Sequence, residues 1–171
     1  LRTNRITSRS RFFFFCSFGE NSAALTADKE QTMHVMADSA DLNQQTHKGT
    51  YLGNVELIQG TTNVQANKAI TIGNEKNQLM VAIASGVPGK QAHYWTTTDP
   101  AKPPVHAYAD TIKYFPLKHL IELIGNAKVE QGANSFSADK ITYDIVNQHV
   151  ISNGTKKQRI TIIYHPEKKS S

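Results

Sequence analysis

Cysteine is nearly absent from this chain of 171 residues, and the single copy, Cys16, lies within the first two dozen positions. If those positions form a leader, as argued below, the rest of the chain has no thiol. That excludes disulfides, cysteine metal sites and thiol catalysis there. A run of about 18 apolar residues is also missing, which excludes a conventional membrane-spanning helix. The seven histidines include no His-x-His or His-x-x-x-His pair, and neither a Gly-x-Ser-x-Gly elbow nor a phosphate loop occurs. We therefore expect no metal, no cofactor and no enzymatic activity.

The N-terminal segment differs from the rest of the chain in charge and in apolar content. Four arginines precede the apolar stretch Phe12–Phe18, and the small residues Ser22, Ala23 and Ala24 follow it. This order is that of a secretory signal, so we expect a signal peptide over residues 1–24, cleavage near Ala24 and export. The formal charge of +5 would then fall to +2, because 15 basic and 13 acidic residues remain. Nucleic-acid binding thereby loses its main support.

A pattern of 36 residues occurs twice in the chain, 72 positions apart. Val35–Ile70 aligns without gaps on Ala107–Thr142, and nine of the 36 pairs are identical. The identical pairs are Ala37/Ala109, Asp38/Asp110, His47/His119, Gly53/Gly125, Asn54/Asn126, Gln59/Gln131, Gly60/Gly132, Ala66/Ala138 and Lys68/Lys140. Because one short unit cannot bury its apolar face alone, the repeat predicts a core that is continuous across both copies.

Short segments rich in β-branched and aromatic residues, separated by glycine, asparagine and proline, predict an all-β chain. The expected strands are residues 33–38, 50–59, 63–72, 79–85, 92–97, 105–115, 120–131, 135–144, 149–153 and 159–164. The proline-rich segment 99–104 is expected to be a loop between two halves. These features favour an antiparallel sandwich or jelly roll. We expect one domain over residues 25–166 and a C-terminal tail over 167–171.

One segment conflicts locally with this interpretation. Pro116–Gly125 places four aliphatic residues on one helical face, with proline at its start and glycine at its end. Its aligned copy, Gln44–Gly53, has no such stripe and is typical of a turn and a strand. Because agreement between the copies outweighs local propensity, we predict a strand here as well.

The sequence resembles the OstA/LptA family of lipopolysaccharide transport proteins. The resemblance rests on Ala37-Asp38, Gly53-Asn54-Val55, Gln59-Gly60, Gly125-Asn126-Ala127, Gln131-Gly132, Ala138–Asp144 and Pro166, and it extends from about Met33 to Pro166. It implies a slightly twisted, half-open β-jelly roll with an apolar interior. It also implies a periplasmic protein that binds the acyl chains of lipopolysaccharide and assembles head-to-tail through its terminal strands. An LptC-like partner at the inner membrane and an LptD-like partner at the outer membrane would complete the route.

Alternation along the strands selects the residues that would face the interior. The predicted groove residues are Val55, Leu57, Val64, Tyr94, Ile112, Tyr114, Leu123, Val129, Phe136 and Ile141. Such residues ordinarily form a packed core, and they form a binding groove only where the two sheets stay apart. The alternative is a secreted β-sandwich that binds carbohydrate or acts as an adhesin. In that case Trp95, with Tyr94, Tyr108 and Tyr114, would stack on sugars.

Overall fold

The computed structural model of the protein describes residues 31–166 except 98, 145–146, 148 and 156–158. The expected leader with Cys16 and the expected tail over 167–171 lie outside the described residues. The described chain forms twelve strands and one turn of 3₁₀ helix. The elements are β1 (His34–Met36), β2 (Ser39–Asn43), β3 (Lys48–Gln59), β4 (Thr62–Gly73), β5 (Leu79–Ser85), β6 (Ala92–Thr96), β7 (Val105–Ala109), β8 (Thr111–Phe115), η1 (Pro116–Lys118), β9 (Leu120–Gln131), β10 (Asn134–Asp144), β11 (His149–Asn153) and β12 (Thr161–Ile163).

All strand pairs are antiparallel, and the four long strands each contribute to two layers. One layer runs β2, β3, β4, β5, β8, β9, β10, β11, and it uses the parts of the long strands near residues 48–52, 68–72, 120–124 and 140–144. The other runs β1, β3, β4, β6, β7, β9, β10, β12 and uses the remaining parts of the same strands. The predicted half-open antiparallel jelly roll is confirmed.

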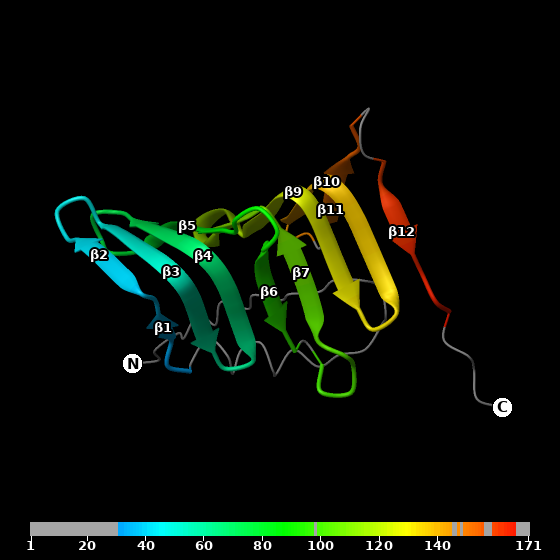
Figure 1. Ribbon diagram of the computed structural model, residues 1–171, viewed down its shortest axis with the longest axis horizontal. Coiled ribbons are helices and arrows are strands. Elements are labelled where there is room, and N and C mark those ends of the chain that lie inside the picture. Colours follow the sequence, from blue (N-terminus) through cyan, green and yellow to red (C-terminus); the bar gives the residue numbers. More distant parts are fainter. Residues whose placement is uncertain (1–30, 98, 145–146, 148, 156–158, 167–171) are drawn as a thin grey trace, which may run out of the picture.

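The repeat in the sequence is a repeat in the topology. Strands β1 to β4 of the first copy correspond to β7 to β10 of the second, and the two copies join through β5–β8 and β6–β7. The strands lie side by side along the long axis of the molecule, with β1 and β2 near one end and β12 at the other (Figure 1). The two ends of the molecule therefore consist of strands that have one neighbour each.

Strands β3 and β9 each pass from one layer to the other at a sharp bend, called here the corner. Both copies form this corner in the same way. The pairing of β3 with β4 shifts register between Leu52 and Val55, where Gly53 has φ +76° and Asn54 has φ +44°. The Asp38 N–H donates to the Gly53 carbonyl at 2.9 Å, and Asn54 Nδ2 donates to Asp38 Oδ2 at 3.0 Å. A side chain at Gly53 would collide with the Asp38 carboxylate, so this position requires glycine.

The second copy repeats this corner at Asp110, Gly125 and Asn126. The Asp110 N–H donates to the Gly125 carbonyl at 2.9 Å, and Asn126 Nδ2 donates to Asp110 Oδ2 at 2.9 Å. The three identical pairs of the sequence at these positions are therefore explained by one corner that occurs twice.

The predicted strands occur, with three corrections. The segment 105–115 is two strands rather than one, because the chain turns at the Asp110 corner. Ser39–Asn43 forms β2, which the sequence did not predict, because all five of its residues are exposed and only Ala40 and Leu42 supply an apolar alternation. The disputed segment from Pro116 enters β9 at Leu120, so the strand prediction is right, but its first three residues form 3₁₀ turn η1.

Candidate functional site

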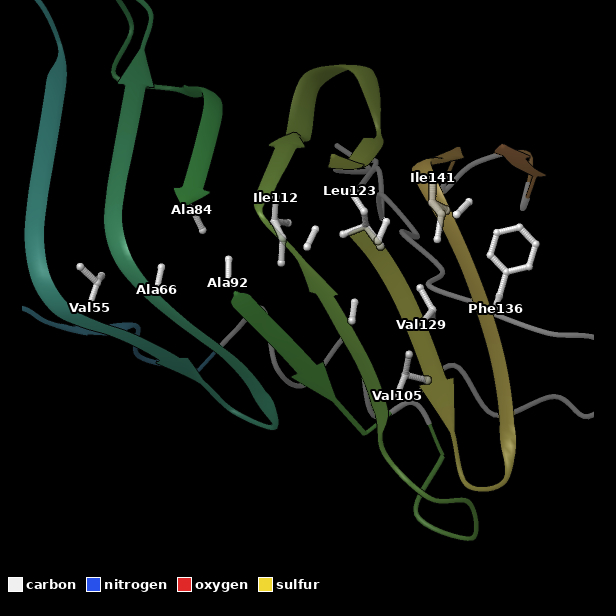
Figure 2. Close-up of a cluster of buried hydrophobic side chains, with 14 residues drawn as sticks. Val55, Ala66, Ala84, Ala92, Val105, Ile112, Leu123, Val129, Phe136 and Ile141 are labelled. Atoms are coloured by element: carbon white, nitrogen blue, oxygen red, sulfur yellow. The ribbon is translucent and has the colours of Figure 1, made fainter. Parts of the chain in front are cut away.

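An apolar cavity lies between the two layers and has a volume of about 310 Å³. Its lining is almost entirely aliphatic or aromatic. It comprises Met33, Val35, Tyr51, Val55, Leu57, Gln59, Thr62, Val64, Ala66, Ala69, Ile70, Thr71, Leu79, Ala82, Ile83, Ala84, Tyr94, Thr96, Val105, Ala107, Ile112, Tyr114, Ile121, Leu123, Val129, Ile141 and Tyr143. Figure 2 shows the buried part of this interior as a row of side chains that crosses the strands from Val55 on β3 to Phe136 on β10.

Nine of the ten predicted groove residues line this cavity, contributed by six strands. The exception is Phe136, which is buried in the apolar core but is not part of the cavity lining. It lies on β10 opposite Val129 of β9 on one side and Ile162 of β12 on the other. Its side chain therefore fills space near the C-terminal end instead of lining an open one.

At equivalent positions, the second repeat copy gives the cavity larger lining residues than the first copy does. Ala69 and Thr71 line the cavity on β4, and their counterparts Ile141 and Tyr143 line it on β10 and are 1% and 3% exposed. Val64 is likewise replaced by the buried Phe136. The sequence prediction missed Ala69, Ala82 and Ala84, because a short apolar side chain gives a weak alternation signal.

The few polar groups of the lining are neutral. Thr96, the one polar side chain fully buried among the described residues, is 1% exposed, and its Oγ1 lies 3.0 Å from Oγ1 of Thr62. Burial raises the pKa of the Tyr114 phenol, so this group stays uncharged at neutral pH. A cavity with such a lining can hold hydrocarbon, because it offers little polar surface that would lose hydration.

The structure does not bring together the four aromatic residues that would stack on sugars in the carbohydrate-binding alternative. Tyr94 and Tyr114 line the cavity, whereas Trp95 and Tyr108 stack with His93, with ring centroids 4.5 and 4.3 Å from it. Stacking on one another covers ring faces that would otherwise meet a sugar.

The same outer cluster contains a histidine pair. His93 Nε2 lies 3.0 Å from His106 Nδ1. Burial lowers the pKa of His93, the neighbouring His106 lowers it further, and Glu130 opposes them. Among the described residues, no three histidine, cysteine or acidic side chains gather as a metal site would require. No helix in the described part is long and apolar enough to cross a membrane.

The fold and the cavity define the chain as an open antiparallel β-jelly roll with an apolar cavity between its layers. Residues 34–149 match the family model described as LptA/(LptD N-terminal domain) LPS transport protein. The chain belongs to this family.

Individual relatives agree with this assignment. The lipopolysaccharide export system protein LptH of Pseudomonas aeruginosa is 34% identical over 155 residues, which cover 86% of each chain. LptA of Escherichia coli K12 is 31% identical and covers 84% of this chain and 76% of the relative. LptA of Haemophilus influenzae is 29% identical, with 84% and 82% covered.

A solved structure also matches. The crystal structure of LptH, described as the LptA-homologous periplasmic component of the lipopolysaccharide transport device of P. aeruginosa, has a TM-score of 0.71 and 31% identity. The match covers 82% of this chain and 99% of that one. These relatives are named for transport, which agrees with the prediction that the chain is not an enzyme.

Proposed function

We propose that this protein carries lipopolysaccharide through the periplasm by enclosing acyl chains in the cavity between its two layers. The observation that carries this proposal is the aliphatic lining, to which both repeat copies contribute. Membership of the transport family and the periplasmic description of the LptH structure support the substrate and the compartment. The nine predicted residues that line the cavity would contact the lipid.

The free energies involved require such an enclosure. Exposing a methylene group to water costs about 0.8 kcal/mol, so a chain of about twelve methylenes costs on the order of 10 kcal/mol. Sugar groups remain well hydrated outside and need no such cover. A cavity that takes only the acyl chains would therefore hold the lipid where its transfer to water is most unfavourable.

The size of the cavity indicates that one molecule does not cover a whole multi-chain lipid. Its 310 Å³ is near the lower end of small-molecule sites, which span about 300–1,000 Å³. Head-to-tail pairing of the terminal strands would extend the groove, because strands with a free edge readily accept another strand. An LptC-like partner at one end and an LptD-like partner at the other would then supply and receive the lipid.

Adjacent residues on β6 provide a matched test of this function. Tyr94 lines the cavity, whereas Trp95 lies in the stacked cluster with His93. A photo-crosslinking amino acid at position 94 should capture lipopolysaccharide, and the same group at position 95 should capture little. Polysaccharide freed of its acyl chains should compete poorly. Equal labelling at the two positions, or full competition by the delipidated sugar, would refute the proposed mode of binding.

A further inference from the structure

The strands at the two ends of the molecule are counterparts of strands that pair with one another in its middle. Strand β5 pairs with β4 so that Ser85 is opposite Lys68, and β11 pairs with β10 so that Asn153 is opposite Lys140. Strand β6 places Trp95 opposite Asn63, and β12 places Ile163 opposite Ser135. Both comparisons equate residues 68 positions apart, so β11 and β12 are the counterparts of β5 and β6. At the other end, β1 and β2 are the counterparts of β7 and β8.

Inside the molecule, a set of hydrogen bonds, called here the clasp, joins the Asp110 corner of the second copy to the first copy. The Gly86 N–H donates to the Asp110 carbonyl at 2.9 Å. The Gln91 side chain donates through Nε2 to Asp110 Oδ1 at 3.1 Å and to the Asn126 carbonyl at 3.0 Å. One amide therefore ties the carboxylate and the backbone of this corner to the segment between β5 and β6.

The corner of the first copy offers the same acceptors, and the counterparts of the donors lie at the far end. In the described residues, the hydrogen bonds of the Asp38 corner come from its own copy, through Gly53 and Asn54. The positions equivalent to Gly86 and Gln91 are Gly154 and Arg159, which are both exposed. Arginine thus replaces glutamine where the acceptor is a carboxylate.

We infer that Arg159 of one molecule clasps the Asp38 corner of the next. This inference rests on the head-to-tail assembly proposed above and gives it a register. The Arg159 guanidinium donates to the Asp38 carboxylate and to the Asn54 carbonyl, and the Gly154 N–H donates to the Asp38 carbonyl. The charge strengthens the clasp, because a guanidinium–carboxylate hydrogen bond is stronger than the neutral bond of Gln91.

The apolar residues at the two ends agree with this register. By equivalence with Tyr94 opposite Ala107, Ile162 lies opposite Val35 of the next molecule. Ile162 is 59% exposed and Val35 is 39% exposed in the single molecule. Val35 also lines the cavity. The junction therefore covers exposed apolar side chains and continues the lining from one molecule to the next.

Charge variants at position 159 test the clasp. Self-association is measured by sedimentation velocity over a range of protein and salt concentrations. We expect Arg159→Glu to weaken it by about tenfold or more, the size expected for loss of a charge-assisted bond with added repulsion. Arg159→Gln should associate more strongly than Arg159→Ala, because glutamine makes the equivalent contact inside the molecule. Lys76→Glu, an equal charge change in the exposed turn after β4, should associate like the parent.

Disulfide trapping tests the register separately. Ile160 and Ala37 are the counterparts of Ala92 and Ala109, which are opposite one another in the internal junction. With Cys16→Ser as background, an equal mixture of Ile160→Cys and Ala37→Cys proteins should form a mixed dimer on oxidation, more than Ile160→Cys mixed with a Lys76→Cys control. If the parent associates but Arg159→Glu behaves like Lys76→Glu, or the mixed dimer does not form, the clasp is wrong and assembly stands. A parent protein that stays monomeric throughout would overturn both.

Discussion

His93 Nε2 on β6 lies 3.0 Å from His106 Nδ1 on β7, and the two imidazole rings are inclined by only 18° with centroids 5.2 Å apart. The two nitrogens therefore face each other nearly in the plane of the rings, where one N–H can donate to the lone pair of the other nitrogen. The pair therefore joins β6 to β7 through a hydrogen bond between the rings, and His106 also contributes to the lowered pKa of His93.

Acidification should lower the stability of the protein through His93. Its pKa is lowered in the folded state by burial and by His106, while Glu130 opposes them. The unfolded chain then binds more protons, so stability falls as the pH drops below about 6.5, the ordinary value for histidine. Thermal unfolding between pH 7.5 and 5.5 should show a drop in Tm that His93→Gln makes smaller. His165→Gln, at an exposed position near the C-terminus, should leave the drop as it is. An unchanged profile in His93→Gln would contradict this account.

Gly53→Ala should destabilise the fold more than Gly89→Ala. Both glycines have φ near +80°, but only at Gly53 would the added Cβ meet another group, the Asp38 carboxylate. The left-handed conformation costs an L-residue about 1–2 kcal/mol, and loss of the corner hydrogen bonds adds about 1–2 kcal/mol. Urea denaturation should therefore give a loss of about 2–4 kcal/mol for Gly53→Ala and about half of that for Gly89→Ala. Equal losses would mean that the corner contributes little.

Phe136→Ala should separate packing from lipid contact. Phe136 is buried in the core without lining the cavity, so its truncation should cost about 3–5 kcal/mol of folding free energy. Lipid capture from position 94, measured per folded molecule well below Tm, should change little. A variant that keeps its stability but loses lipid capture would place Phe136 in the groove after all.

Replacing a small cavity-lining residue of the first copy with the larger residue at the equivalent position of the second copy should block the cavity. Ala69→Ile introduces the residue found at the equivalent position 141, where it is almost completely buried. The added methyl groups would occupy space between the layers, so lipopolysaccharide crosslinking at position 94 should fall several-fold while the Tm stays equal or rises. Ala101→Ile, in the exposed loop between the copies, provides the matched control. Undiminished crosslinking in Ala69→Ile would show that the acyl chains lie elsewhere.

The sequence predicted features that depend on local alternation and on the repeat. Val55 and Leu57 were correctly placed on the interior face because strand geometry alone sets the side on which alternate residues lie. The prediction for Pro116–Gly125 succeeded only because the aligned copy contradicted its local helical pattern. Phe136 could not be separated from the cavity lining, because that distinction depends on how far apart the layers stand. The contact of Gln91 with the Asp110 corner was also hidden, since it joins segments that neither alternation nor identity connects.

The loop Asp99–Pro104 separates two copies that are otherwise joined by the nine residue pairs of β5–β8 and β6–β7. Proteolytic nicking in this loop would therefore convert the intact chain into two fragments that must recognise each other without a covalent tether. The affinity of the two fragments for one another would then measure the strength of this strand pairing. It would indicate how strongly neighbouring molecules of a head-to-tail assembly bind.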